Sequence, residues 1–321
     1  YAFNKAHAVC YAIVAYQTAW FKCHYPREYM AALLTSVLDS QGKIAEYIAE
    51  CRSLGIRLLP PDINQSGPDF TVAGRDIRFG LAALKGVGRG FTNAVLARRQ
   101  ADGPFTSFPD FCQRLLDEDL NKRVLESLIR AGAFDAMGVR RSQLLDAYEQ
   151  LIDSLTRNRR KNLEGQFDLF SLGQEKPEPV ELVLRDLPEF SQEELMTMEK
   201  EVTGLYLSGH PMDAYRDTVR AQGAVPIASV LEDFAQEEGP TQFQDGQRIL
   251  LAGVVAAAKT KTTKNNSLMA YVTLEDDTGS LELLVFSRVL EESGSYIREN
   301  NAVLVQGKIS VRDEKEPQLM A

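Results

Sequence analysis

Apolar residues recur at helical spacing along the first part of the chain, and the pattern predicts three helices within residues 8–54. Residues 8–24 are apolar on nearly every side, so the first helix is expected to be buried. Pro26 separates it from a helix over residues 28–38. A third helix follows and is expected to end at Gly55.

Shorter elements are predicted between residues 67 and 160. Two extended segments flank the turn Ala73-Gly74-Arg75-Asp76 and indicate a hairpin. Asn121 is a suitable N-cap for a helix over residues 122–130, because its side-chain oxygen can accept a hydrogen bond from a free amide of the first turn. A longer helix over residues 141–157 is expected to end in a basic run.

A linker is predicted over residues 161–190, where prolines and scattered acidic residues show little periodicity. Ser191 and Glu194 then have the spacing of a capping box for a helix over residues 192–203. From that helix to residue 246 we expect a helical connector.

The pattern changes to the alternation of strands after residue 247. Four strands are expected, with a helix over residues 288–298 between the last two. This order fits a five-stranded OB barrel that lacks its last strand. The strands are expected at residues 249–257, 270–274, 281–286 and 302–309. The expected domains are 1–66, 67–160, 161–190, 191–246 and 247–321.

Composition and charge are compatible with a multidomain cytoplasmic protein that binds nucleic acid. The 321 residues exceed what one compact core needs, and no apolar run is long enough to cross a membrane. The net charge is −9, but residues 1–165 carry +4 and residues 166–321 carry −13, and local patches decide DNA binding. The cysteines lack metal-site spacing and are expected to be buried, reduced thiols: Cys10, Cys23, Cys51 and Cys112.

The sharpest local signal is the segment Leu81-Ala-Ala-Leu-Lys-Gly-Val-Gly-Arg-Gly90, which has the form of a helix-hairpin-helix motif. Glycines let the backbone turn tightly and approach a phosphate, and the following helix presents free amides and its positive dipole end. Such contacts bind the DNA backbone without reading sequence. The alternative is a glycine-rich turn that only packs two helices. The predicted DNA-binding residues are Lys85, Gly86, Val87, Gly88, Arg89 and Gly90.

A degenerate second copy of this motif is predicted over residues 124–134, with Gly132 at its hairpin and in contact with DNA. Paired copies are typical of DNA-binding use. The expected fold class is therefore multidomain, with a mainly α-helical N-terminal part that contains tandem helix-hairpin-helix motifs, a linker and a C-terminal β-barrel.

The linker contains a short apolar peptide that could bind a partner. Exposed apolar side chains in a polar segment leave apolar area in water unless a partner's pocket receives them. The alternative is a segment that packs back on its own domain. The peptide consists of Gln166, Phe167, Asp168, Leu169 and Phe170.

In the barrel, the turn between the first two strands is rich in lysine, and OB folds use such loops to bind single strands. The candidates are Lys259, Lys261 and Lys264 and, for base stacking, Tyr271 and Phe286. Exposed lysines in a turn can equally be only solvated, and Phe286 is expected in the core by strand alternation. Residues 275–277 are interpreted as an acidic turn, not a metal site.

Taken in order, several segments resemble the catalytic alpha subunit of bacterial DNA polymerase III over essentially the whole chain. They are Tyr1-Ala-Phe-Asn-Lys-Ala-His-Ala8, Leu59-Pro-Pro-Asp-Ile-Asn64, the Gly86–Gly90 hairpin, Gly132-Ala-Phe-Asp135 and Gly204-Leu-Tyr-Leu-Ser-Gly-His-Pro211.

The resemblance implies that Asn4, Lys5 and His7 contact the incoming nucleotide at the end of the polymerase fingers. The family more often has Ser where this chain has Ala6, so a hydroxyl contact is missing there. Residues 166–170 are similar to the peptide that binds the beta sliding clamp. The implied partners are primed duplex DNA, single-stranded template, the clamp and other replisome subunits.

The resemblance also implies that Mg²⁺-dependent DNA synthesis belongs to a longer parent protein, whose metal-binding carboxylates lie N-terminal to this chain. We therefore expect no catalytic residues and no metal site in the chain itself. Two alternatives remain at this point: a stand-alone DNA-repair binding module, and a tRNA-binding appendage with a similar barrel.

Overall fold

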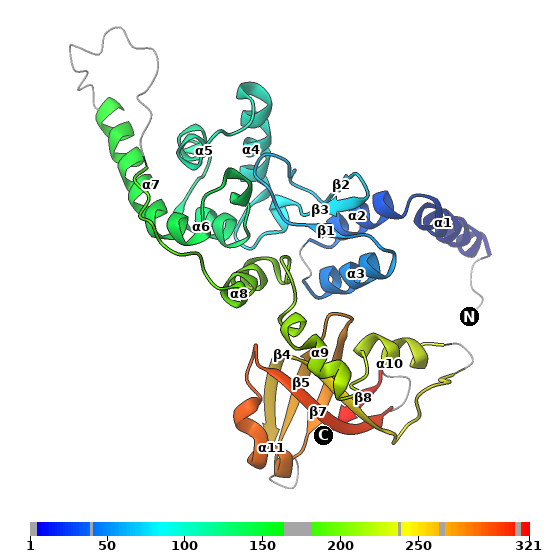
Figure 1. Ribbon diagram of the computed structural model, residues 1–321. Helices are drawn as coiled ribbons and strands as arrows, with labels where there is room; N and C mark the ends of the chain where they lie inside the picture. Colours follow the sequence, from blue (N-terminus) through cyan, green and yellow to red (C-terminus); the bar gives the residue numbers. More distant parts are fainter. Residues whose placement is uncertain (1–4, 39–40, 164–181, 237–238, 263–266, 312–315) are drawn as a thin grey trace. The chain divides into compact units, whose positions relative to one another are not determined.

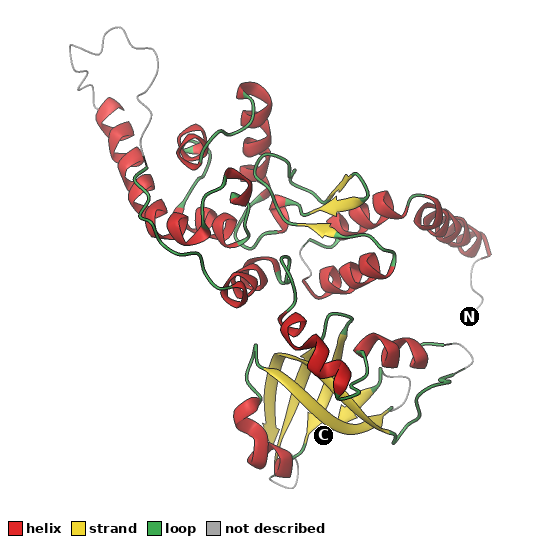
Figure 2. Cartoon of the chain, in the orientation of Figure 1, coloured by secondary structure: helices red, strands yellow, loops and turns green. Residues whose placement is uncertain are grey.

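The computed structural model describes residues 5–38, 41–163, 182–236, 239–262, 267–311 and 316–321 (Figure 1). The chain divides into two compact units, Tyr1–Ser208 and Gly209–Ala321. Figure 2 shows that helices dominate the first unit, whereas strands gather in the second. Within the described ranges, no helix combines the length and apolar character required to cross a bilayer.

The first unit begins with helices α1 (Lys5–His24), α2 (Pro26–Ser36) and α3 (Gln41–Ser53). The predicted burial of α1 is wrong, because the helix has no buried residue. Val14 and Tyr16 are 54% and 70% exposed. An apolar helix forms from its own backbone hydrogen bonds, but the described residues supply no surface that covers it. Cys10 and Cys23 are exposed on α1, whereas Cys51 and Cys112 are buried as expected.

A three-stranded sheet follows, in the order β1 (Leu58–Leu59), β3 (Asp76–Arg78) and β2 (Thr71–Ala73). Strands β2 and β3 form the predicted hairpin. Phe79, directly after β3, is completely buried and lies edge to face with Phe70 at 4.9 Å between ring centroids. The hairpin is thereby fastened to the core of the unit.

The helix-hairpin-helix region contains η1 (Leu81–Ala83), α4 (Arg89–Asp102), α5 (Phe108–Leu115), α6 (Lys122–Arg130), η2 (Asp135–Met137) and α7 (Arg141–Leu163). The expected N-cap is present, because the Asn121 side chain accepts a hydrogen bond from Val124 N at 3.0 Å. Phe108 and Phe111 pack edge to face on Phe134 with centroids 4.9 and 5.1 Å apart. This aromatic cluster holds α5 and the end of α6 together.

Helix α8 (Gln192–Thr203) closes the first unit, and the predicted capping box is present at its start. The side chain of Ser191 accepts from Glu194 N, and the Glu194 carboxylate accepts from Ser191 N at 2.8 Å. Near its other end, the carbonyl of Val202 accepts a hydrogen bond from Lys85 N at 2.8 Å. Helix α8 is thus attached directly to the glycine hairpin at residues 84–90.

The second unit is a closed barrel in the strand order β4-β5-β6-β8-β7. The strands are β4 (Arg248–Thr262), β5 (Leu268–Glu275), β6 (Ser280–Val285), β7 (Ala302–Ser310) and β8 (Gln318–Met320). Neighbouring strands are antiparallel except β6 and β8, which are parallel. This is the OB topology. The expectation that the last strand is missing is corrected, because the three residues of β8 close the barrel.

Helices surround the barrel: η3 (Pro211–Tyr215), α9 (Arg216–Ala221), α10 (Ile227–Phe234), α11 (Ser287–Ser293) and η4 (Gly294–Tyr296). The residues predicted as an acidic turn position one of them. Asp276 accepts hydrogen bonds from Thr278 N and Gly279 N in its own turn and from Ile227 N at the start of α10. The Asp276 carboxylate therefore joins α10 to the barrel.

Candidate nucleic-acid interface

The first glycine hairpin, called the first hairpin below, spans residues 84–90. Buried apolar residues anchor it and leave its glycines at the surface. Leu84 and Val87 are buried, whereas Gly86 and Gly88 are exposed, so the prediction that Val87 contacts DNA is corrected: its side chain packs into the core. Val87 N donates to the carbonyl of Leu84 at 3.1 Å, which closes the turn. Gly86 has φ +81°, a conformation that side chains with a β-carbon rarely adopt. The helix expected before this hairpin is only the single 3₁₀ turn η1.

The N-terminus of α4 directly behind the hairpin is open. Gly88 is the N-cap in an extended conformation, no side chain caps the helix, and no acidic residue lies in its first turn. A β-carbon built on Gly88 or Gly90 would meet no atom within 4 Å. The first amides of a helix have no intrahelical acceptor and carry the positive end of the dipole. This end of α4 can therefore receive an anion.

The charges around the hairpin differ in how strongly they are compensated. Lys85 is exposed, as predicted. Arg89 is exposed too, but its Nη2 forms an ion pair with Asp69 Oδ1 at 2.7 Å. Arg123, at the start of α6, lies next to Gly86, with Nε 3.3 Å from the position that a β-carbon of Gly86 would occupy. Sequence reasoning missed Arg123, because the distance between α6 and the hairpin depends on tertiary packing.

The second hairpin is closed, which corrects the prediction that Gly132 contacts DNA. Gly132 is buried with φ +78°, and a β-carbon on it would lie 2.3 Å from Nη2 of Arg141. The segment after it forms only the short turn η2, which begins with the acidic residue Asp135. Gly132 is therefore inaccessible to a phosphate, and the first amides of α7, which follows, already donate to the carboxylate of Glu189.

Arg141 closes the second hairpin through a buried network. Its Nη2 donates to Asp135 Oδ2 at 2.7 Å and to Glu199 Oε1 at 3.0 Å. Glu199 Oε2 accepts from the amides of Leu207 and Ser208 at 3.0 and 2.8 Å. Burial alone would lower the pKa of Arg141, but the hydrogen bonds and charges of Asp135 and Glu199 raise it overall. The network stabilises the protonated arginine inside the unit.

On the barrel, the predicted residues lie on one outer surface. Lys259 lies opposite Tyr271 across β4 and β5, and the same row continues through Leu284 and Met320 to Lys308. Ala270 and Val272 belong to the core, so Tyr271 between them points outward. Lysines thus flank an apolar and aromatic row, in which Lys308 was not foreseen.

Of the other residues predicted on the barrel, one lies on the same outer surface, one is exposed instead of buried, and one is outside the described residues. Lys261 lies opposite Met269 on the same surface. Phe286 is 44% exposed at the N-cap of α11, so its predicted place in the core is wrong. Lys264 lies outside the described residues.

The residues expected to contact a nucleotide or a clamp are only partly described. Lys5 and His7 lie exposed in the first turn of α1, where the His7 ring is 4.5 Å from that of Tyr11. Asn4 lies outside the described residues. The same is true of the whole apolar peptide Gln166, Phe167, Asp168, Leu169 and Phe170.

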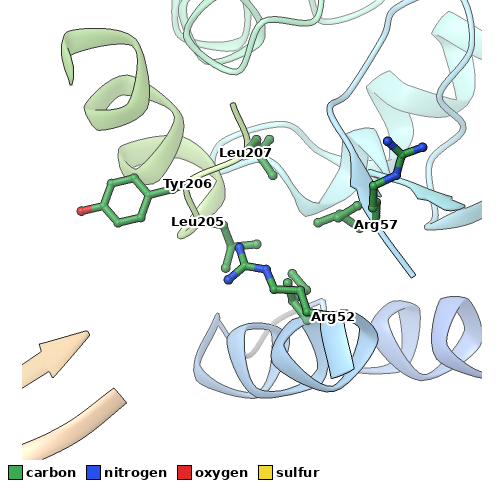
Figure 3. A pocket seen from close by; sticks show the side chains of 7 residues that line it. Arg52, Arg57, Leu205, Tyr206 and Leu207 are labelled. Carbon is green, nitrogen blue, oxygen red and sulfur yellow. The ribbon is translucent and has the colours of Figure 1, made fainter. Parts of the chain in front are cut away.

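A pocket of about 240 Å³ lies in the first unit between α3, β1 and residues 205–207. Figure 3 shows Arg52 extending from α3 toward Leu205. Arg57, also in the lining, is engaged by Asp76 through Nε and Nη2 at 3.2 and 2.8 Å. The pocket therefore offers less free positive charge than its two arginines suggest, and the open hairpin is the better candidate for an anion.

Comparison with known proteins gives matches for both units and for the whole chain. The helix-hairpin-helix motif model matches residues 55–144, and a model described as an OB-fold nucleic acid binding domain matches residues 249–321. The DNA polymerase III subunit alpha of Mycobacterium tuberculosis is 38% identical over 98% of this chain and 26% of its own length. That of Thermus aquaticus is 39% identical over 98% of this chain and 25% of its own length.

The chain is homologous to DNA polymerase III alpha subunits over nearly its whole length. It spans about a quarter of the length of the alpha subunits that it matches. The helix-hairpin-helix match includes both glycine hairpins and Arg123. Among solved structures, an SSB domain from Synechococcus sp. aligns with 25% of this chain and 92% of its own, at 19% identity and a TM-score of 0.21. A score this low adds nothing to the alpha-subunit assignment.

Proposed function

We propose that the chain is the DNA-binding and clamp-tethering portion of a bacterial replicative DNA polymerase. The observation that carries the proposal is the open N-terminus of α4 behind the exposed Gly86 and Gly88. Its free amides and dipole favour a phosphate, and the absence of side chains on the glycines lets the DNA backbone come close. Such binding is independent of base sequence.

In the second unit, the barrel would hold single-stranded template. In support, Tyr271 and Met320 in the outer row are partly exposed and offer surface to bases, whereas Leu284 between them is buried, and Lys259 and Lys308 lie at the ends of the row. Stacking on aromatic side chains, combined with a basic surface along the backbone, is how OB folds bind single strands.

Processive synthesis by the parent protein would need a tether to a sliding clamp. We assign that role to residues 166–170, by the resemblance of this peptide to the clamp-binding peptides of the family. Lys5 and His7 would contact the incoming nucleotide, and Mg²⁺ would be held by carboxylates of the parent protein outside this chain. The chain alone is therefore not expected to extend a primer.

The duplex contact is tested by Gly88→Val. Valine accepts the extended conformation of Gly88, and its β-carbon meets no atom within 4 Å, but its methyl groups occupy the space that a phosphate needs. We expect about tenfold weaker binding to labelled duplexes of two unrelated sequences, equally for both, in fluorescence anisotropy. Ala136→Val adds similar bulk at an exposed position beside the closed hairpin and should change nothing.

Unchanged duplex binding by Gly88→Val would remove the hairpin from the proposal. A competition assay between primed duplex and tRNA tests the tRNA-binding alternative, and a preference for the duplex decides against it.

The clamp tether is tested separately. Replacing Leu169 and Phe170 by alanine should abolish capture by the sliding clamp and leave DNA affinity nearly unchanged. Clamp binding that survives this change would end the tether proposal.

A further inference from the structure

The side chain of Arg123 lies across the first hairpin although it comes from a different helix. It occupies the first turn of α6, whose start is fixed by the hydrogen bond from Val124 N to the Asn121 side chain. A β-carbon built on Gly86 would lie 3.3 Å from Nε of Arg123 and 3.8 Å from its Cγ and Cδ. The aliphatic stem and the start of the guanidinium therefore run along the outer side of Gly86.

Glycine at position 86 has two roles in this geometry. Its φ of +81° forms the turn, and the missing β-carbon leaves room for Arg123 to lie against the backbone. A larger residue would push the arginine away from the hairpin. The fold thus brings the side chain of Arg123, from α6, against the hairpin that leads into α4.

The charge of Arg123 is not compensated in the way that those of its neighbours are. Lys122 binds Glu149 and Asp153 at 3.2 and 3.1 Å. Arg89 is paired with Asp69. In the part of the chain that the structure describes, no carboxylate forms an ion pair with Arg123, whose side chain is exposed. Its planar group of donors is therefore available to an oxyanion from outside.

We propose that Arg123 is a phosphate-binding residue of the first hairpin, so that α6, the helix that leads into the second hairpin, contributes a side chain to the site of the first. The inference rests on the proposed duplex-binding function and adds a residue to that site. The guanidinium binds one phosphate of the DNA backbone by two parallel hydrogen bonds, while the amides of α4 bind the backbone beside it. The contact is equal for all sequences.

The test is a salt titration of duplex binding with the full 321-residue chain. Loss of one phosphate contact reduces the steepness of log K against log salt by about 0.9. We expect Arg123→Gln to show that change and about fivefold weaker binding near 0.1 M salt. Lys122→Gln removes a charge from the same helical turn, but one held by two carboxylates, and should leave the salt slope unchanged.

Arg123→Lys separates charge from geometry. It should restore the salt slope, because the charge is present, and recover only part of the affinity, because an ammonium group cannot bind a phosphate through the same two parallel donors. The free energy of unfolding of both Arg123 variants, measured in urea, should equal that of the parent chain, since Arg123 is exposed.

The inference is overturned if Arg123→Gln has the salt slope and affinity of Lys122→Gln, or if it lowers stability without changing the slope. Gly88→Val, measured in parallel, distinguishes failure of this inference from failure of the proposed duplex-binding function. If Gly88→Val weakens binding and Arg123→Gln does not, only the inference fails. If neither variant weakens binding, the proposed function of the hairpin fails as well.

Discussion

The two glycine hairpins of the first unit are alike in backbone and opposite in access. Gly86 and Gly132 have φ values of +81° and +78°, and an arginine lies over each. Gly86 is exposed under the exposed Arg123, whereas Gly132 is buried under Arg141, whose side chain is 6% exposed. What lies over the turn, and not the turn itself, decides whether a ligand can reach it.

The closed hairpin contains its own anions. Asp135 and Glu199 accept hydrogen bonds from Arg141, so carboxylates of the chain take the place that a phosphate would need. The open hairpin is followed by the uncapped start of α4, with no acidic residue in its first turn. The second hairpin is therefore a structural contact that holds α8 and residues 207–208 in place, whereas the first hairpin leaves its helix end accessible to an anion.

The largest expected effect comes from opening the closed hairpin. Arg141→Met leaves the carboxylate of Glu199, 1% exposed, without its cation in the interior. Removing one partner of a buried pair costs about 3–5 kcal/mol of unfolding free energy. Urea denaturation monitored by circular dichroism measures this loss.

Lys122→Met is the matched control for Arg141→Met. Its two ion pairs are largely exposed, and exposed pairs contribute about 0–1 kcal/mol each. If the two methionine variants unfold at the same urea concentration, the buried network does not hold the closed hairpin together.

A second pair of variants compares the two hairpins through their glycines. Gly132→Ala places a β-carbon 2.3 Å from Arg141 Nη2 at a φ of +78°, and we expect a loss of about 2–4 kcal/mol from clash and backbone strain. Gly88→Ala, at φ −79° with open space around it, should stay within about 0.5 kcal/mol of the parent. Thermal unfolding of both variants under one condition checks the contrast; equal losses would contradict it.

Local signals in the sequence predicted much of the fold. Asn121 and the pair Ser191 and Glu194 mark the starts of α6 and α8, because capping depends on residues only a few positions apart. Four of the five barrel strands follow from their alternation. Strand β8 was missed because it has three residues and pairs in parallel with β6, which no local pattern encodes.

The site was predicted less completely, since access depends on distant contacts. In the sequence, Gly132 of the second hairpin looks open; it is closed in the structure because Arg141 binds Glu199, 58 residues further along the chain. The pairing of Arg89 with Asp69 and the place of Arg123 over Gly86 likewise arise only in the folded unit. The apolar α1 was expected to be buried, and sequence cannot specify which surface would cover it.

A smaller effect is expected from the acidic residue beside the open hairpin. Asp69 is paired with Arg89 and lies where it would repel a phosphate. Asp69→Asn frees the arginine, and we expect about two- to fivefold tighter duplex binding at low salt, with a steeper salt dependence. Glu118→Gln, which releases Arg98 from a comparable pair on α4, is the control. Weaker binding by Asp69→Asn would indicate that Asp69 positions Arg89 for DNA.

The smallest effect concerns the acid sensitivity of the closed hairpin. Glu189 accepts hydrogen bonds from the amides of Arg141 and Ser142 at 2.8 and 3.0 Å, so it holds the start of α7 and the backbone of the arginine. Partial burial raises the pKa of Glu189, but these amides and that of Phe190 outweigh it and hold the pKa below its ordinary value.

A lowered pKa means that Glu189 stabilises the fold above the ordinary glutamate pKa of about 4.3, and that this contribution is lost as the pH falls further. Glu189→Gln cannot titrate, so its unfolding free energy should fall less between about pH 6 and pH 3 than that of the parent chain. Glu193→Gln, a change at an exposed carboxylate on α8, controls for charge. If Glu189→Gln and the parent chain lose stability equally, Glu189 does not secure the start of α7, and the second hairpin is held closed by Asp135 and Glu199 alone.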